Sequence, residues 1–364
     1  MIPATNAIQR PADAKLLAVD EYGMIRHEAR SHLVNLLYPG DLVIANDAAT
    51  IPASLHGMHL PSSRPIEVRL AGRTSLDHEE LKQFSAVVFG EGDFRARTED
   101  RPLPPALRPG DLLRFGSLQA TIAAVIGHPR FVSLHFDGST QQIWEGLARH
   151  GSPIQYSHIR KPLALWDTWT AVAGLPAAFE PPSAGFMLDW RTVLAMADRG
   201  IGFVTITHAA GLSSTGDARL DARLPFDEPY RIPPSAARVI RAAKARKARI
   251  VAIGTSVVRA LEHAALRDGT VAAGDGLATQ RISADTRLSV VDAIVSGTHD
   301  PGTSHYDLLR AFIDDATSRK VDRELESHGY RTHEYGDSVF VQRRRNAASS
   351  DVSSQGERFL AAIH

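Results

Sequence analysis

Residues 248–262 read ARIVAIGTSVVRALE, and this stretch decides the fold class. The apolar run before Gly254 predicts a buried strand, after which Thr255 or Ser256 caps a helix. In open α/β sheets, ligands bind at the carboxyl ends of such strands, and free helix amides favour a carboxylate or phosphate there. Arg259, one turn into the helix, adds a positive charge. The alternative is an ordinary capped helix without a ligand.

Helix and strand patterns alternate on both sides of this stretch. The predicted elements are a hairpin at 15–28, strands at 41–46, 202–207 and 289–295, helices at 188–200, 235–248 and 305–327, and a last strand after 337. The helix at 188–200 is expected to pack through Trp190, Val193, Leu194 and Ala197. The long helix at 305–327 is expected to pack through Leu308, Leu309, Phe312 and Ile313. This alternation predicts an α/β layer with a substantial parallel sheet.

The segment from about residue 54 to residue 146 has a different pattern. Short runs of alternating apolar and polar residues are separated by Gly, Pro and Asp clusters at hairpin distances. This pattern is typical of a small β-barrel or sandwich. We therefore predict an α/β domain built from both ends of the chain with an inserted all-β, barrel-like domain. The predicted boundaries are 1–53 and 151–345 for the α/β domain, 54–150 for the inserted domain, and 346–364 for a flexible tail.

Composition excludes several classes of chemistry. The chain of 364 residues has no cysteine, which excludes disulfides, cysteine nucleophiles, iron–sulfur clusters and thiolate zinc sites. Its 16 histidines are the expected carriers of acid–base or metal chemistry. With 41 basic and 41 acidic residues, a nucleic-acid partner would need a local basic patch. The chain shows neither a membrane-length apolar run nor a secretory signal, which predicts a cytoplasmic protein without membrane contact.

Several loops carry candidate functional groups. Residues 181–186, PPSAGF, are a second segment that leads from a strand into a helix. Gly185 allows another backbone or a ligand to approach closely there. The alternative is a structural turn. A loop rich in Gly, Pro and Ser holds His299 and His305, which suit catalysis or, with neighbouring aspartates, a metal. Asp337, in the turn before the last strand, is either a turn residue or a carboxylate that faces a ligand.

A run of six basic residues without an acidic one suits RNA phosphates. The alternative is a solvated helix face that leads into the buried strand. The six residues are Arg238, Arg241, Lys244, Arg246, Lys247 and Arg249.

In order and spacing, these segments resemble the S-adenosylmethionine:tRNA ribosyltransferase-isomerase (QueA) family of queuosine biosynthesis, over about residues 14–341. Residues 39–57, PGDLVIANDAATIPASLHG, resemble the family's opening strand. PPSAGF is similar to its Pro-Thr-Ala-Gly-Leu-His-Phe motif, and IVAIGTSVVRALE to its Val-Gly-Thr-Thr-Ser-Val-Arg-Thr-Leu-Glu motif. VVDAIVSGTHDPGTS, residues 290–304, and HEYGDSVFV, residues 333–341, resemble its two closing motifs.

The resemblance implies a two-domain enzyme that transfers and isomerises the ribosyl group of S-adenosylmethionine. The acceptor would be a 7-aminomethyl-7-deazaguanine base of tRNA, and the product epoxyqueuosine. S-adenosylmethionine would be a co-substrate, with no other cofactor and no metal. The tRNA would be held by a local basic patch, and the sequence leaves the oligomeric state open, a monomer being favoured.

The matched positions suggest the site residues. Glu228 and His299 are the expected acid–base groups, and His208 and Asp337 are further catalytic candidates. The donor is expected to be surrounded by residues of the matched loops. These are Ser183, Gly185, Gly254, Thr255, Ser256 and Arg259.

The chain departs from the family's motifs at four histidine positions. Thr207, followed by His208, stands at one of them, and Met187 at another. LPFDE, residues 224–228, lacks both histidines of a third motif but keeps Glu228. Two alternatives therefore stay open. One is a divergent paralogue that uses S-adenosylmethionine or a related nucleoside with a different acceptor; the other is a non-catalytic protein that binds RNA or a nucleoside.

Overall fold

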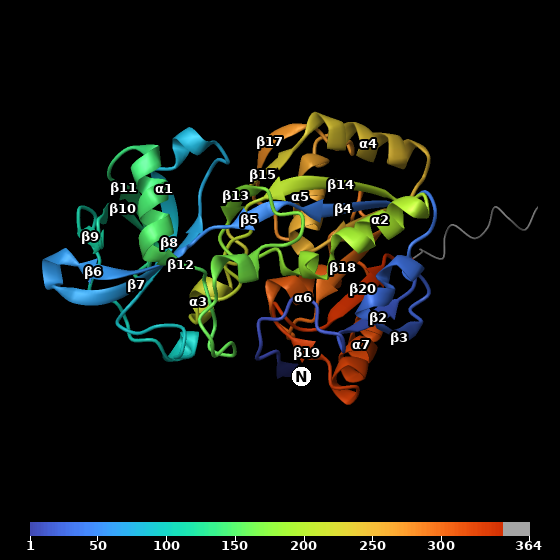
Figure 1. Cartoon of the computed structure of the whole chain (residues 1–364), viewed down its shortest axis with the longest axis horizontal. Helices are drawn as coiled ribbons and strands as arrows, with labels where there is room; N and C mark the ends of the chain where they lie inside the picture. The colour runs from blue at the N-terminus through green and yellow to red at the C-terminus, as the bar shows by residue number, and fades with distance from the viewer. Residues whose placement is uncertain (345–364) are drawn as a thin grey trace, which may run out of the picture.

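The structure is a computed structural model that describes residues 1–344. The predicted flexible tail, residues 346–364, lies outside the described residues. Figure 1 shows a part built of β-strands, with helix α1 (Thr140–His150) packed on it, beside a larger α/β part in which strands from the beginning and the end of the chain lie together. The predicted fold class, an α/β fold with an inserted barrel, is confirmed. Among the described residues, no helix is long and apolar enough to cross a membrane.

A nine-stranded mixed sheet forms the centre of the α/β part. Of its eight neighbouring pairs, four are parallel and four antiparallel, so the predicted parallel character holds for half of the sheet. In spatial order the strands are β17 (Gly274–Ala278), β15 (Glu228–Ile232), β14 (Gly202–His208), β4 (Leu42–Asn46), β16 (Ile250–Ile253), β18 (Ala293–Gly297), β20 (Ser338–Gln342), β2 (Lys15–Val19) and β3 (Ile25–Ala29).

The central strands are buried on both faces, which explains why they are continuous apolar runs in the sequence. In β4, Leu42 and Ile44 belong to one core cluster, and Val43 and Ala45 to the other. Helices α4 to α7 contribute to the first cluster, and α2 contributes to the second. The helices are α1 (Thr140–His150), α2 (Trp190–Asp198), α3 (Ala218–Asp221), α4 (Pro234–Ala245), α5 (Thr255–Ala264), α6 (Ser304–Leu309) and α7 (Asp315–Ser327).

Six antiparallel strands close into a barrel, because the first of them pairs with both the second and the fourth. They are β6 (Ser54–His59), β7 (Arg64–Gly72), β8 (Gln83–Phe89), β9 (Leu112–Phe115), β10 (Leu118–His128) and β11 (Phe131–Phe136), with the short β12 (Gly151–Ser152) added beside β6. Helix α1 packs on the barrel core through Ile143 and Leu147. These elements support residues 54–150 as the inserted domain, and we keep the boundaries as a proposal.

Short parallel pairs and 3-10 helices complete the described chain. β1 (Ile2–Pro3) pairs with β19 (Arg331–Thr332), and β5 (Ala48–Thr50) with β13 (Leu175–Ala178). The 3-10 helices are Arg30–Leu36, Leu60–Ser62, His78–Glu80, Thr98–Asp100, Leu165–Thr168 and Ser183–Met187.

The prediction of one long helix at 305–327 is wrong. The segment forms two helices, α6 and α7, and the break between them contains Phe312 and Ile313, which are buried. Asp314 starts the second helix, because its carboxylate accepts the backbone N–H of Thr317 at 2.9 Å. Such an acidic cap competes with continuation of the preceding helix.

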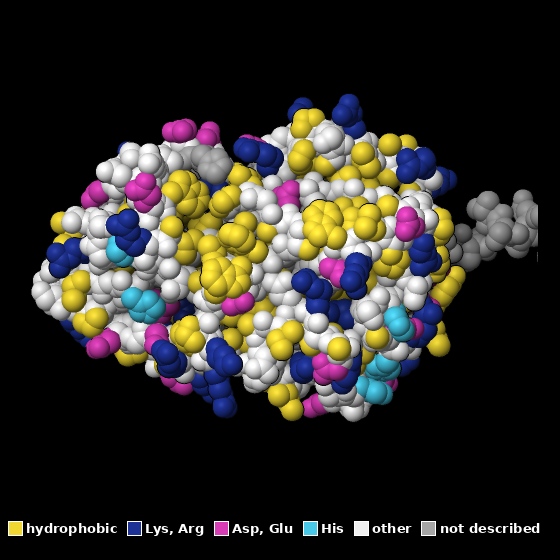
Figure 2. Space-filling model, viewed as in Figure 1, with side chains coloured by type: hydrophobic (Ala, Val, Ile, Leu, Met, Phe, Trp, Pro, Cys, Tyr) yellow, Lys and Arg dark blue, Asp and Glu magenta, His cyan; other side chains and the backbone are white. Residues whose placement is uncertain are grey.

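The predicted packing face of the helix at 188–200 is wrong for Trp190, Leu194 and Ala197, which are exposed, while Val193 packs against the core as predicted. In α2, Trp190 and Leu194 are 64% and 63% exposed, and Met196 is the residue that the core buries. Figure 2, drawn from the same side as Figure 1, shows hydrophobic side chains at the surface over the middle of the molecule. The strand predicted at 289–295 begins only at Ala293.

We predict that Glu262→Ala lowers the free energy of unfolding by about 3 kcal/mol, because buried N–H groups lose their acceptor. Glu262 Oε1 accepts the backbone N–H groups of Val290 and Val291, and Oε2 accepts that of Ser289. These bonds fasten α5 to the segment that leads into β18. Urea denaturation measures the effect. Glu326→Ala, on the exposed side of α7, is the control and should stay within about 0.5 kcal/mol of the wild type.

Candidate active site

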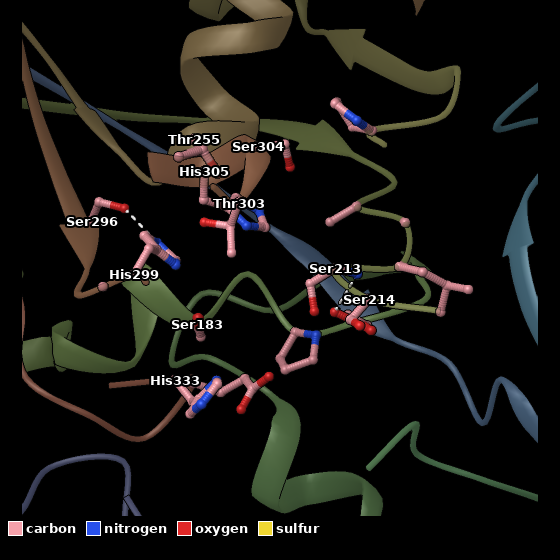
Figure 3. Close-up of a pocket in the computed structure, with 18 of the residues that line it drawn as sticks. Ser183, Ser213, Ser214, Thr255, Ser296, His299, Thr303, Ser304, His305 and His333 are labelled. Atoms are coloured by element: carbon pink, nitrogen blue, oxygen red, sulfur yellow. Dashed lines mark hydrogen bonds between the residues drawn. The ribbon is translucent and has the colours of Figure 1, made fainter. Parts of the chain in front are cut away.

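A cavity of about 610 Å³ lies where the carboxyl ends of central strands approach the barrel part. The loops after β14, β16 and β18 line it with residues 210–214, 254–256 and 296–300, and the barrel part contributes residues 97–99. Figure 3 shows labelled Ser, Thr and His side chains that reach this space from several elements. The volume falls within the range of about 300–1,000 Å³ that is typical of small-molecule sites.

The junction between β16 and α5 presents free amides to this cavity. Gly254 has a φ of +98°, a conformation that favours glycine, and it occupies the N-cap position. The prediction that Thr255 or Ser256 caps the helix is therefore wrong, since no side chain accepts the amides of the first turn. Ser183, Gly254, Thr255 and Ser256 all line the cavity, as expected. Unpaired amides at a helix N-terminus suit an anionic group of a ligand.

Glu228 and Arg259 form a buried ion pair on the cavity wall. The guanidinium donates to Glu228 Oε2, and Oε1 accepts the backbone N–H of Gly211 at 2.6 Å. Both side chains line the cavity and are less than one-tenth exposed. Since both carboxylate oxygens already accept hydrogen bonds, this pair is better suited to holding a ligand than to moving a proton.

His208 lies behind this ion pair and is completely buried. Its Nε2 is 3.3 Å from Glu228 Oε2, but neither ring nitrogen makes an aligned hydrogen bond. Burial lowers the pKa of His208 to about 4, against the opposite effect of the Glu228 charge, so the ring is neutral at pH 7. His208 does not belong to the cavity lining, and Glu228 lies between it and the cavity.

His299 and His305, in the loop after β18 and at the start of α6, both line the cavity. Their rings stack with centroids 4.7 Å apart, and the Nε2 of His299 lies 3.1 Å from Ser296 Oγ (Figure 3). Burial lowers the pKa of His299 well below its usual value, and burial also lowers the pKa of His305. Both rings are therefore neutral at pH 7 and able to donate and accept hydrogen bonds.

A second wall of the cavity was missed by the sequence analysis. Its five polar residues come from three segments: Tyr156, His158, Glu180, His333 and Glu334. Tyr156 donates a hydrogen bond to Glu180, and His158 Nε2 lies 3.1 Å from Glu334 Oε2. Glu180 directly precedes PPSAGF, and His333 and Glu334 are the first two residues of the matched segment HEYGDSVFV, so these positions were the signal available in the sequence.

Two predicted site residues lie elsewhere. Asp337 is 1% exposed, and its two oxygens accept the backbone N–H groups of Lys15 and Arg331, each at 2.8 Å. It does not line the cavity, so we leave it out of the catalytic group. Gly185 is also absent from the lining; a Cβ there would come within 2.9 Å of Thr170, so this glycine permits close packing of two loops.

The predicted basic patch lies away from the cavity. Its last residues, from Lys244 to Arg249, lie between the end of α4 and the beginning of β16, at the opposite edge of the sheet from Gly254. Arg249 is bound to Asp41, and Lys244 donates to the carbonyl of Val290. The patch therefore does not border the cavity.

Two clusters of the described residues offer nitrogen and oxygen atoms that could bind a metal ion. His158, His333 and Glu334 lie on the cavity wall, and His27, Glu324 and His328 lie on the surface, where α7 faces β3. In each cluster the candidate ligand atoms lie within 4.8 Å of one another.

We predict that Asp337→Ala lowers the free energy of unfolding by about 2–4 kcal/mol, because it leaves the amides of Lys15 and Arg331 without acceptors. Asp337→Asn keeps one acceptor oxygen and should lose less. Chemical denaturation followed by circular dichroism checks both variants. An alanine variant as stable as the wild type would contradict the structural role.

Comparison with known proteins gives a consistent family assignment. The family model described as "Queuosine biosynthesis protein" matches residues 2–341. An S-adenosylmethionine:tRNA ribosyltransferase-isomerase from Anaeromyxobacter dehalogenans is 33% identical, over 92% of this chain and 94% of the relative. A protein of the same name from Ralstonia nicotianae is 32% identical, over 96% and 95%.

Among solved structures, an S-adenosylmethionine tRNA ribosyltransferase from Thermotoga maritima matches with a TM-score of 0.48 at 20% identity. The match covers 93% of this chain and 95% of that one. The sequence relatives and the family model, which spans nearly all of the described residues, carry the assignment. The chain belongs to the queuosine biosynthesis protein family.

Proposed function

We propose that this protein is an S-adenosylmethionine:tRNA ribosyltransferase-isomerase of queuosine biosynthesis. It transfers and isomerises the ribosyl group of S-adenosylmethionine onto a 7-aminomethyl-7-deazaguanine base of tRNA. Adenine and methionine leave, and epoxyqueuosine in tRNA is the product. The proposal rests on the family membership of the chain and on the cavity into which its matched segments converge.

The convergence of the matched segments is the observation that carries the proposal. PPSAGF, the Gly254 junction and the His299 loop are far apart in the sequence, and each contributes lining residues to the same cavity. A shared cavity is expected if these segments bind one ligand. The free amides of Thr255 and Ser256, at the start of α5, suit the carboxylate of the methionine part.

The geometry assigns different roles to the expected acid–base groups. Glu228 is held by Arg259 and Gly211, so we give it a positioning role for the donor. His299 lines the cavity as a neutral imidazole, which can accept a proton and later return it. His208 supports Glu228 from behind.

The departures from the family's motifs lie mostly outside the cavity. Met187 is buried in the core cluster under α2, and Thr207 donates to Asp47 at 2.6 Å. Phe226 stacks on Phe131 of the barrel at 4.5 Å between ring centroids. These substitutions therefore do not change the polar residues that line the cavity. The property that they leave open is which acceptor the protein uses.

We propose tRNA as the second substrate, a monomer in the cytoplasm as the working state, and no cofactor beyond S-adenosylmethionine. The basic patch on α4 can contact a tRNA only at a distance from the reacting base. Arg97 and Arg281, with side chains 68% and 41% exposed, lie on the cavity lining and offer nearer contacts for phosphates.

We expect adenine to be released when the protein is incubated with S-adenosylmethionine and tRNA that carries the aminomethyl-deazaguanine base. Liquid chromatography of the free base measures this release. Adenine released without that tRNA, or with another acceptor, would favour a divergent paralogue. Salt-sensitive RNA binding without any binding of the donor would favour a non-catalytic protein.

We predict that Glu228→Gln lowers the rate of adenine release by about a hundredfold or more, because Arg259 and the Gly211 loop lose their anionic partner. The single variant should also lose stability, since it leaves a buried guanidinium unpaired. The double variant Glu228→Gln with Arg259→Gln removes both charges and should regain stability without regaining activity. Normal turnover in a folded Glu228→Gln protein would refute the role.

A further inference from the structure

Glu180 is a buried carboxylate on the cavity wall whose hydrogen bonds are all to neutral groups. It follows β13 and is 6% exposed. Its Oε1 accepts a hydrogen bond from Tyr156 at 2.5 Å, and its Oε2 accepts the backbone N–H of Ser213 at 3.1 Å. These bonds hold the carboxylate in place, but a phenol and an amide do not balance its charge.

No basic side chain in residues 1–344 forms an ion pair with Glu180. The field of Arg69 reaches Glu180, but its guanidinium is ion-paired with Glu67 at 2.8 Å and lies over the ring of Tyr156, 5.4 Å from its centroid. His333 faces the same wall, and burial lowers its pKa, so it brings no positive charge at neutral pH. Buried charges in proteins are normally paired, and this one is not.

A second carboxylate increases the excess of negative charge. Glu334 lies on the same wall, where His158 Nε2 is 3.1 Å from its Oε2. Burial, and next the charge of Glu334, raise the pKa of Glu180 to about 7. A cation placed in the cavity would remove this cost.

The opposite end of the cavity has the reverse polarity. There the free amides of α5 favour an anion, while Arg259 and Glu228 balance each other's charge. In Figure 3, Thr255 at the start of α5 and His333 of the second wall lie on opposite sides of the labelled residues. The cavity is therefore polarised, with an anion-binding end and a cation-binding end.

S-adenosylmethionine has charges that fit this polarity. Its α-ammonium is bonded to the carbon that carries the carboxylate, so a carboxylate at α5 keeps the ammonium at that end. The methionine side chain separates the sulfonium from the carboxylate and the ammonium. The sulfonium is therefore the cationic group that can lie further along the cavity. We propose that the carboxylate of Glu180 is the counter-charge of the donor's sulfonium and selects it over neutral thioethers. This proposal rests on the proposed function.

The charge pairing links donor binding to pH. Below pH 7 Glu180 is protonated in the empty protein, and the sulfonium must displace that proton to gain its counter-charge. Binding of S-adenosylmethionine should therefore weaken by up to about tenfold for each pH unit below 7 and release a proton to the buffer. S-adenosylhomocysteine has a neutral sulfur, so its affinity should change little over the same range.

Isothermal titration calorimetry of the full-length protein tests the proposal without any tRNA. We expect the wild type to bind S-adenosylmethionine on the order of ten- to a hundredfold more tightly than S-adenosylhomocysteine at pH 8. Glu180→Gln should abolish this preference, and it should also abolish the proton release that the wild type shows below pH 7 in buffers of different ionisation enthalpy. Glu145→Gln, on the exposed side of α1, should leave both unchanged.

Two further variants separate charge pairing from a structural role. Tyr156→Phe removes a hydrogen bond that lowers the pKa of Glu180, so the midpoint of the pH dependence should move up. Glu334→Gln removes a negative charge that raises this pKa, so the midpoint should move down. A merely structural role of the wall would not shift the midpoint in opposite directions.

The outcomes also separate this proposal from the proposed function. If adenine is released but the two ligands bind equally well, or Glu180→Gln keeps the preference, the sulfonium role is overturned and the function stands. If the wild type shows no preference for S-adenosylmethionine and binds Zn²⁺, and His158→Ala loses the Zn²⁺ binding, a metal ion is the counter-charge of Glu180 and the proposal is overturned. If the protein neither binds the donor nor releases adenine, both are overturned.

Discussion

The buried ion pair between Arg259 and Glu228 holds together the parts that form the site. Besides Glu228, the guanidinium donates to the carbonyls of Ala278 and Gln280, at 2.8 and 2.9 Å. One side chain of α5 thus joins β15, β17 and the segment after β17. Glu228 in turn holds the loop at Gly211, which lines the cavity. Breaking such a pair leaves a buried charge without a partner. The packing at this edge of the sheet and the shape of the cavity therefore both depend on the pair.

Around this pair the cavity separates two kinds of charge. Helix α5 presents its positive end, and the wall of Tyr156, Glu180 and Glu334 presents carboxylates. His305 lies in the field of both regions, since the charges of Glu228 and Glu334 each act on its pKa, although burial dominates and lowers it. In the proposed binding mode, the carboxylate of S-adenosylmethionine lies at α5 and its sulfonium lies near Glu180.

Much of the fold could be predicted from the sequence. The strands at 42–46 and 250–253 are apolar runs because both faces of the central sheet are covered, and the barrel strands alternate because one face is solvated. The prediction of one long helix failed because Asp314 caps a new helix. The predicted packing face of α2 failed because apolar residues on one face of a helix, such as Trp190 and Leu194, do not all contact the core. The prediction of Thr255 or Ser256 as the N-cap was also wrong. Where a serine or threonine follows a glycine, the sequence does not show which residue takes the N-cap position.

The sequence by itself determined most of the elements, the inserted barrel, the strand-to-helix junction at Gly254 and the family. Those features depend on apolar periodicity, turn residues and ordered motifs, all of which are local. Only the tertiary structure decided that Asp337 ties backbone segments together, that the basic patch lies at the far edge of the sheet, and that Glu180 faces the cavity near Glu334. The reason is physical: pairing, desolvation and pKa depend on distances through space between residues that are far apart along the chain.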